Sequence, residues 1–211
     1  MNTAAWILAV TAAALPLGPC AEPVTPVRSI DTQRFAGTWY ELARLPGQPQ
    51  AECERDVTTH YAPRADGTLQ VVRSCRTPTG RVATDVGRAW AQGADTRHAA
   101  RWTLSFMPRW LQWLPLAKGD HWVVMLDPAY RFAVISEPKR RSLWVMARSP
   151  ALPADDLGRI VDRLAAEGYP TEQLVLTRQS AVVQRIGPDQ AVPFTGRPRL
   201  MVRHAAAPDA A

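Results

Sequence analysis

Apolar and polar residues alternate along most of the chain between residues 35 and 148, which is the period of a half-buried β-strand. The clearest case is the segment 100–106, where Trp102, Leu104 and Phe106 share one face and polar residues share the other. Runs of this kind predict strands at 35–44, 53–61, 69–75, 82–90, 100–106, 121–126, 130–136 and 142–148. Eight short strands joined by turns favour an all-β fold.

The pattern changes period after residue 150. Apolar residues at 157, 160, 161 and 164 follow helical spacing, two Asp residues occupy the first turn, and Gly168 follows as a C-terminal cap. A helix is therefore expected over Pro153–Glu167, with a short closing strand at 173–176. The segment 181–211 contains four Pro, scattered Arg and a final Ala-rich run, so we expect a disordered tail there.

The first strand carries a signal of its own. Gly37 permits a sharp bend or a close backbone approach, and Trp39, Glu41 and Ala43 are expected to share one face of the strand beyond it. A bulky indole thus lies at the end of a strand. A small closed barrel needs such a plug if its other mouth is to admit a ligand.

Three stretches together resemble the conserved blocks of the lipocalins. Gly37-Thr38-Trp39-Tyr40-Glu41 resembles the first block, Leu126-Asp127-Pro128-Ala129-Tyr130 is similar to the second, and 143–150 resembles the third, which contains Arg148. The likeness covers roughly Ile30 to Gln179 and looks closest to bacterial outer-membrane lipocalins and apolipoprotein D.

This resemblance implies an eight-stranded antiparallel up-and-down β-barrel with one C-terminal helix packed on its wall. It places Gly37, Trp39 and Arg148 at the barrel floor, with the guanidinium of Arg148 over the Trp39 indole, a contact worth about 0.5–2 kcal/mol. Tyr40, Glu41, Asp127 and Tyr130 are the further motif residues that the resemblance carries over.

Composition agrees with one such domain plus appendages. Hydrophobic residues make up 46% and charged residues 21% of the 211-residue chain, enough to bury a core. The net charge of +6 is spread along the chain rather than gathered in a stripe, which argues against a nucleic-acid partner. A mild positive charge of this kind is better explained by attraction to an anionic lipid headgroup or a membrane surface.

The N-terminal residues resemble an export signal. Ala4 to Leu17 is apolar but shorter than the roughly 20 residues of a spanning helix, and Cys20 after Leu17-Gly18-Pro19 resembles the lipidation site of bacterial lipoproteins. We expect a signal peptide at 1–20, a tether at 21–29, the barrel domain at 30–179 and the tail at 180–211. The expected location is the outer membrane, as a periplasm-facing lipoprotein; a soluble periplasmic protein is the alternative.

The cysteines predict one disulfide. If the hairpin that joins the second and third strands is centred on Arg64, Cys53 and Cys75 fall opposite each other, with Cβ atoms about 4.5–5.5 Å apart. Of the three cysteines, Cys20 is then left without another Cys to pair with, and lipidation would explain its presence. The cysteines lack metal-site spacing, and we expect neither a metal nor a cofactor.

The segment 107–116 joins the fifth and sixth strands and is unusually apolar for a loop. It contains Trp110 and Trp113, which are costly to expose. These indoles could form a lid over the cavity, lie in a bilayer interface, or pack on the barrel rim as ordinary core.

Candidate chemistry points to binding rather than catalysis. The four His residues are dispersed without partners and are each expected at the surface or rim: His60, His98, His121 and His204. The expected cavity lining is apolar and consists of Trp102, Leu104, Phe106, Trp122, Trp144 and Met146. Such a cup suits a fatty acid or lysophospholipid, held by a monomer or homodimer. A tetrapyrrole or isoprenoid binder, or a lipocalin-type enzyme acting on a lipid, is the alternative.

Overall fold

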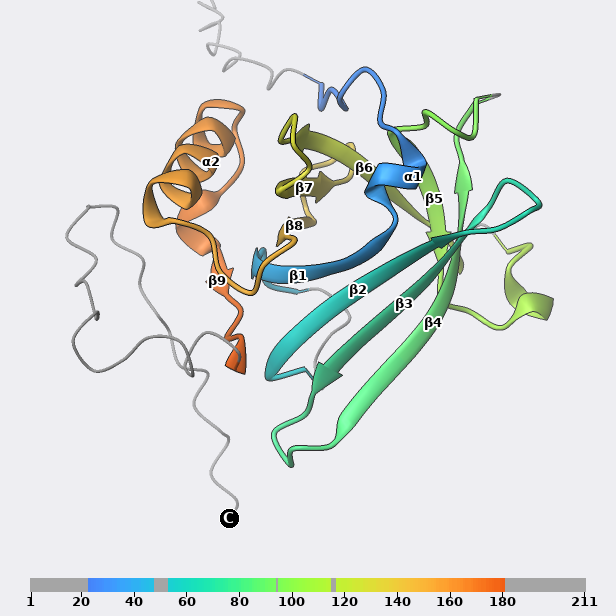
Figure 1. Cartoon of the computed structure of the whole chain (residues 1–211), viewed down its shortest axis with the longest axis horizontal. Helices are drawn as coiled ribbons and strands as arrows, with labels where there is room; N and C mark the ends of the chain where they lie inside the picture. The colour runs from blue at the N-terminus through green and yellow to red at the C-terminus, as the bar shows by residue number, and fades with distance from the viewer. Residues whose placement is uncertain (1–22, 48–52, 94, 115–116, 181–211) are drawn as a thin grey trace, which may run out of the picture.

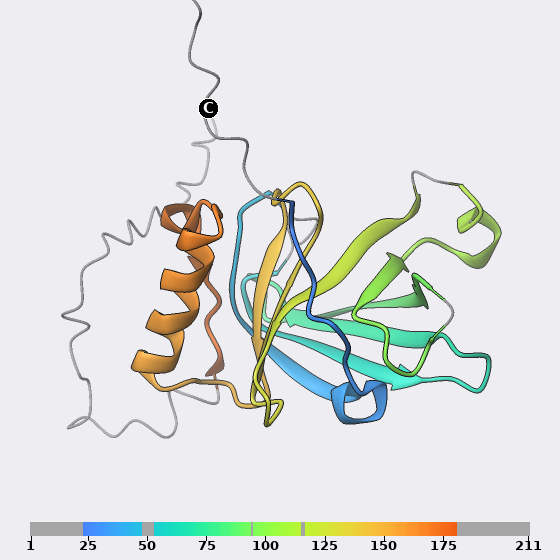
Figure 2. The same ribbon diagram turned by 90° about the horizontal axis from the view of Figure 1, so that it is seen from above.

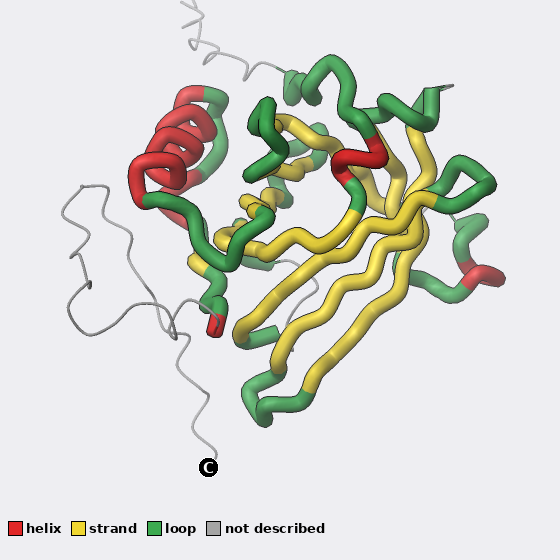
Figure 3. Tube along the Cα trace, in the orientation of Figure 1, coloured by secondary structure: helices red, strands yellow, loops and turns green. Residues whose placement is uncertain are grey.

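The predicted strands are present and close into a barrel (Figures 1 and 3). The computed structural model describes residues 23–47, 53–93, 95–114 and 117–180. Its strands are β1 (Gly37–Arg44), β2 (Arg55–Pro63), β3 (Leu69–Arg76), β4 (Val82–Ala91), β5 (Arg101–Ser105), β6 (Gly119–Leu126), β7 (Phe132–Ser136), β8 (Leu143–Ala147) and β9 (Val175–Leu176). Its helical elements are α1 (Thr32–Phe35), η1 (Arg109–Leu111), α2 (Ala154–Ala166) and η3 (Thr171–Gln173).

Each strand from β2 to β7 pairs antiparallel with the next, and β1 closes the barrel by pairing with both β8 and β2. Eight strands form this closed, up-and-down barrel, and β9 adds to the far half of β1 outside it. A closed barrel has no exposed sheet edge, which removes the risk of edge-to-edge aggregation. The predicted fold class is confirmed.

The predicted C-terminal helix is also confirmed. α2 lies against the outside of the wall in Figure 2, with Ile160 and Leu164 buried and Leu157 and Val161 packed against a second apolar cluster between helix and barrel. Gly168, at a φ of 80°, ends the helix, and the backbone N–H of Tyr169 donates to the carbonyl of Leu164.

The barrel therefore has two cores, one inside and one under α2. The register of β1 with β8 shifts between Glu41 and Ala43, which marks a β-bulge. Beyond this bulge, a residue that simple alternation would point into the barrel packs on the outer core instead. Trp39 belongs to the interior cluster, whereas Ala43 belongs to the outer one. The expectation that Trp39, Glu41 and Ala43 share one face was wrong for Ala43.

The predicted disulfide is confirmed, but the register used to predict it was not. Cys53 and Cys75 are bonded, with Cα atoms 5.5 Å apart. In the hairpin, however, Thr59 pairs with Arg73 and Pro63 with Leu69, so the turn is centred two residues later than Arg64. The pairing shifts by one residue near Asp56, whose φ is 55°, and Cys53 lies just before β2, next to Glu54, whose backbone N–H donates to the carbonyl of Arg76.

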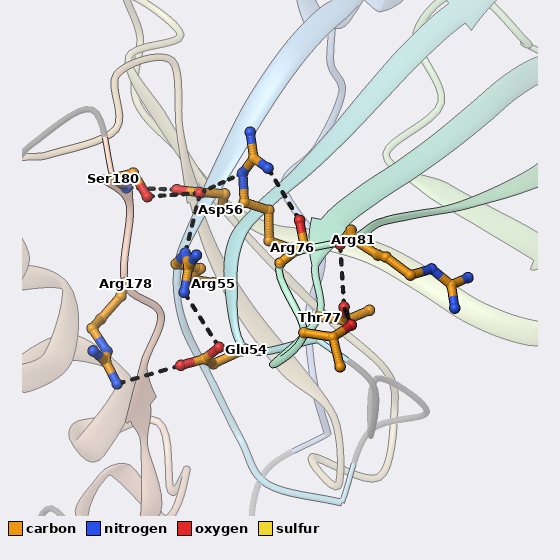
Figure 4. A network of polar contacts seen from close by, with 10 residues as sticks. Glu54, Arg55, Asp56, Arg76, Thr77, Arg81, Arg178 and Ser180 are labelled. Carbon is orange, nitrogen blue, oxygen red and sulfur yellow. Dashed lines mark hydrogen bonds and ion pairs between the residues drawn. The ribbon is translucent and has the colours of Figure 1, made fainter.

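Asp56 also joins the start of β2 to the end of the described chain, in a network of polar contacts (Figure 4). Its carboxylate accepts hydrogen bonds from the backbone N–H and hydroxyl of Ser180, at 2.5 and 2.7 Å, and forms ion pairs with Arg55 and Arg76. The positive φ of Asp56 is thus held by contacts on several sides.

The expected signal peptide, Cys20 and nearly all of the expected tail lie outside the described residues. The part of the expected tether that is described contacts the barrel. Val24 is buried in the outer cluster, and the backbone N–H of Val27 donates to the carbonyl of Val123 on β6 at 2.9 Å. This segment therefore follows the barrel wall.

Candidate ligand-binding site

The floor of the barrel is built on Arg148, as the resemblance implied. Its guanidinium carbon lies 3.9 Å from the centroid of the Trp39 ring. Its nitrogens also donate to three backbone carbonyls, those of Arg34, Ala36 and Thr38, at 2.6 to 3.0 Å. One side chain therefore joins the end of β8 to α1 and the start of β1.

Gly37 is required at this point for two reasons. Its φ is 95°, a backbone conformation that side chains with a Cβ rarely adopt. A Cβ at this position would also lie 3.2 Å from Nη1 of Arg148. The motif glycine thus lets the guanidinium approach the backbone and stack on Trp39.

Four aromatic rings form a layer above this contact, which we call the floor layer: Phe35, Trp39, Tyr61 and Trp102. The centroid of Phe35 lies 4.8 to 5.4 Å from those of the other three rings. The indole N–H of Trp39 donates to the carbonyl of Phe35 at 2.8 Å. These side chains are all fully buried, so this end of the barrel is sealed.

The second motif shapes a turn beside α1. The carboxylate of Asp127 accepts hydrogen bonds from the side chain and backbone N–H of Arg131 and from the N–H of Ala129, and the Arg131 side chain in particular lowers the pKa of Asp127. The hydroxyl of Tyr130 accepts from the backbone N–H of Asp31 at 2.8 Å. The motif therefore fixes α1, and through it the floor.

Above the floor layer the barrel interior contains a few polar side chains among the apolar ones. The hydroxyl of Tyr61 and Nε2 of His121 lie 2.8 Å apart, and both side chains are buried. Burial, together with the charge of Arg73, lowers the pKa of His121 to about 3, and burial raises the pKa of Tyr61. His121 is therefore neutral at physiological pH.

The motif residue Glu41 faces the same polar interior and is only 1% exposed. Its Oε1 accepts a hydrogen bond from the hydroxyl of Thr177 at 2.6 Å and lies 3.8 Å from a guanidinium nitrogen of Arg44. The motif residue Tyr40 is half-buried on the neighbouring position of β1, which pairs with Thr58 and Ala147.

The opposite end of the barrel opens into a cavity of about 780 Å³, which we call the mouth cavity. This volume lies in the range typical of ligand pockets. The cavity combines apolar side chains with a basic rim: Leu104, Phe106, Met107 and Trp144 line it together with Arg73, Lys118, Lys139 and Arg141, and Asp120 and Glu137 supply the acidic side chains. Beneath it lies a smaller cavity of only about 10 Å³ beside Tyr61, Arg73 and His121.

The structure brings five of the six expected lining residues into the barrel, at different depths. Leu104, Phe106 and Trp144 line the mouth cavity, and Met146 lines the small cavity below it. Trp102 lies lower still, in the floor layer.

Trp122 corrects the expectation, because it packs against the outer cluster and its indole N–H donates to the side chain of Gln92. Its neighbour His121 occupies the inward position instead, which also corrects the expected surface or rim position of His121. His60 and His98 are exposed as expected, and His204 lies outside the described residues.

The apolar loop between β5 and β6 leaves its indoles in solvent. Trp110 is 72% exposed and Trp113 is 73% exposed, so the described part of this loop does not bury them on the rim as core. Met107, Ala117 and Lys118, at the two ends of the loop, line the mouth cavity. The loop therefore borders the open end of the barrel, whereas Trp39 and Arg148 seal the other end.

Sequence reasoning missed the polar interior formed by Tyr61, Arg73 and His121. A signal was present, because these residues alternate with outward positions on strands whose other inward residues are apolar. Across the described ranges no three His, Cys, Asp or Glu side chains gather into a potential metal site. None of the helices in that part of the chain is long and apolar enough to cross a bilayer.

Comparison with known proteins agrees with this geometry. The family model of the lipocalin-like domain matches residues 30–179. The outer membrane lipoprotein Blc of Escherichia coli (strain K12) is 30% identical over 179 residues, which are 82% of this chain and 96% of that protein. Apolipoprotein D of Mus musculus is 23% identical over 78% of this chain and 84% of its own length. The structure of H1 crustacyanin from the lobster Homarus americanus shares the fold with a TM-score of 0.53, at 13% identity over 75% of this chain and 82% of its own.

Proposed function

Because the chain belongs to the lipocalin family, we propose that it binds and carries a fatty acid or lysophospholipid in the open end of its barrel. The observation that carries this proposal is the mouth cavity. It is large enough for a single-chain lipid, it opens at the end opposite the sealed floor, and Leu104, Phe106 and Trp144 give it apolar walls.

The loop between β5 and β6 supports exchange of that ligand with a membrane. Exposed indoles are favoured at the interface between lipid and water, and Trp110 and Trp113 stand beside the mouth cavity. The basic side chains at the rim include Lys118 and Lys139, which would attract an anionic lipid surface. Docking of this loop on a bilayer would present the cavity to lipid.

The proposed location is the bacterial outer membrane, with Cys20 lipidated and the barrel facing the periplasm. Support comes from the sequence around Cys20 and from the similarity to a protein named an outer membrane lipoprotein. Replacement of Cys20 by Ser should move the protein from the membrane fraction to the soluble fraction. If wild-type protein is already soluble in the periplasm, the lipoprotein proposal is wrong.

The binding proposal is tested by organic extraction of natively purified protein and mass spectrometry of the extract. A carrier should release a fatty acid or lysolipid in near-stoichiometric amount, and refilling the emptied protein should quench its Trp fluorescence. Release of a coloured tetrapyrrole or isoprenoid would replace the proposed ligand. Steady conversion of an added lipid ester would show an enzyme and overturn the assignment as a carrier.

A further inference from the structure

Arg73 on β3 is a cation between the two cavities. It lines both the mouth cavity and the small cavity beneath it. Its guanidinium carbon lies 4.6 Å from the centroid of the Phe106 ring, which lines the mouth cavity. Among the described residues, the Arg73 side chain makes no hydrogen bond and has no ion-pair partner within 4 Å.

The carboxylates nearest to Arg73 do not neutralise it through a close contact. Glu41 is held by Thr177 and Arg44, and Asp85, which is paired with Arg73 across β3 and β4, is exposed. Burial lowers the pKa of Arg73 below its ordinary value, while Tyr61, Glu41 and Asp85 act from a distance to raise it. A guanidinium keeps its charge under these conditions, so a half-buried positive charge is left without a closely paired anion.

A second donor lies in the same place. Trp144 on β8 also lines both cavities, and its indole N–H is buried without an acceptor in the described structure. Buried donors normally have a partner, because leaving one unmade costs about 1–3 kcal/mol. Arg73 and Trp144 thus both place N–H groups at the base of the mouth cavity, and the indole N–H of Trp144 has no acceptor among the described residues.

We propose that Arg73 and Trp144 bind the carboxylate of a single-chain fatty acid that enters head first, with its hydrocarbon chain extending toward the mouth past Leu104 and Phe106. This inference rests on the proposed binding function and specifies the head group and direction of the ligand. The small cavity below has room for only about 10 Å³, which is too little for a hydrocarbon chain. A compact planar carboxylate matches the fork of a guanidinium.

The test compares three ligands with the same chain: oleate, oleyl alcohol and 1-oleoyl-lysophosphatidylcholine. Each is titrated into delipidated protein, and binding is followed by Trp fluorescence and calorimetry. Wild-type protein should bind oleate about tenfold or more tightly than the alcohol, as expected for hydrogen bonds to a charged group. The variant Arg73→Met should lose that difference by weakening oleate alone, and Arg73→Lys should retain part of it.

Arg101→Met is the matched control, because Arg101 is an exposed Arg on β5 whose guanidinium lies 5.9 Å from the outward-facing Trp122. It should bind oleate as wild type does. Unchanged oleate affinity in Arg73→Met, or equal binding of oleate and the alcohol to wild type, would overturn the inference. Tighter binding of the lysophospholipid would overturn the carboxylate assignment while leaving the carrier function intact. Failure of all three ligands to bind would contradict the proposed function itself.

A measurement on wild-type protein keeps the inference testable if Arg73→Met does not fold. The carboxyl carbon of bound [1-¹³C]oleate is followed by NMR as the pH is lowered. A carboxylate paired with Arg73 should resist protonation and titrate well below the ordinary range of an exposed carboxyl group. A bound carboxyl that titrates as an exposed group does would place the head at the mouth and refute the head-first orientation.

Discussion

Removal of the Arg148 side chain tests how the floor of the barrel is held. In Arg148→Ala the protein loses the stacking on Trp39 and three hydrogen bonds to backbone carbonyls. The cation–π contact contributes about 1 kcal/mol, and each hydrogen bond, discounted for the partial exposure of this side chain, contributes about 0.5–1 kcal/mol. The expected loss in free energy of unfolding is about 3 kcal/mol, or a drop in Tm of roughly 6–12 °C.

A double-mutant cycle isolates the contact between the two side chains. Trp39→Ala alone should cost about 3–5 kcal/mol, as truncation of a large buried aromatic residue does. Combined with Arg148→Ala it should cost about 1 kcal/mol less than the sum of the two single changes, because the contact can be lost only once. Urea unfolding followed by circular dichroism at 25 °C supplies the four free energies.

The control cycle uses Arg101→Ala, which removes an exposed Arg from β5 without touching the floor. It should change stability by no more than about 0.5 kcal/mol and should be additive with Trp39→Ala. Additive losses in the Arg148 cycle would show that stacking on Trp39 contributes nothing, and that Arg148 acts through the backbone carbonyls alone.

Three further changes have defined outcomes. Gly87→Ala should destabilise the protein by about 1–3 kcal/mol in urea unfolding, because its Cβ would lie 2.8 Å from a backbone carbonyl oxygen and from the Phe106 ring. Stability should fall as the pH drops from about 6.5 towards 3, because His121 becomes protonated in the unfolded chain but stays neutral in the folded protein. The urea midpoint of His121→Gln should decline less over the same pH range. Replacing both Trp110 and Trp113 by Ser should leave Tm within a few degrees but slow transfer of a fluorescent fatty acid from anionic vesicles.

Each of these has its own contrary result. Gly158→Ala, where an added Cβ meets nothing within 4 Å, is the control for the glycine and should not destabilise α2; equal effects at both glycines would contradict the steric argument. His60→Gln, at an exposed histidine on β2, should keep the wild-type decline with pH, and so would His121→Gln if burial were irrelevant. A double Trp variant that melts much earlier yet transfers lipid normally would show that the indoles stabilise the fold.

The sequence predicted the barrel well because its strongest signals are local. Alternation located the strands, the helical spacing located α2, and the short motifs located the floor contact between Trp39 and Arg148. The pairing of Cys53 with Cys75 was also correct, although the assumed turn centre was not, since Cys53 lies before β2 and beyond the irregularity near Asp56. A β-bulge or similar irregularity produces no periodic pattern of apolar and polar residues, so periodicity cannot locate it.

The lining of the cavity was harder to predict because β6 is covered on both faces. Its inward face meets the interior cluster and its outward face meets the cluster that includes α2, so apolar residues occur on both. The more hydrophobic residue, Trp122, was therefore predicted to face the cavity, whereas the residue that faces inward is the polar His121. Arg73 was missed for a related reason, because a charged residue in a strand is ordinarily assigned to solvent.

The seam between β1 and β8 has a consequence for how the chain folds. Most neighbouring strands of the barrel follow each other along the chain, but Arg148 and Thr38, which are bonded across this seam, are 110 residues apart. Closing a loop of that length costs roughly 2–3 kcal/mol more entropy than closing a short hairpin. We therefore expect the meander from β2 to β8 to assemble first and the seam to close last. Weakening the seam should then accelerate unfolding far more than it slows folding.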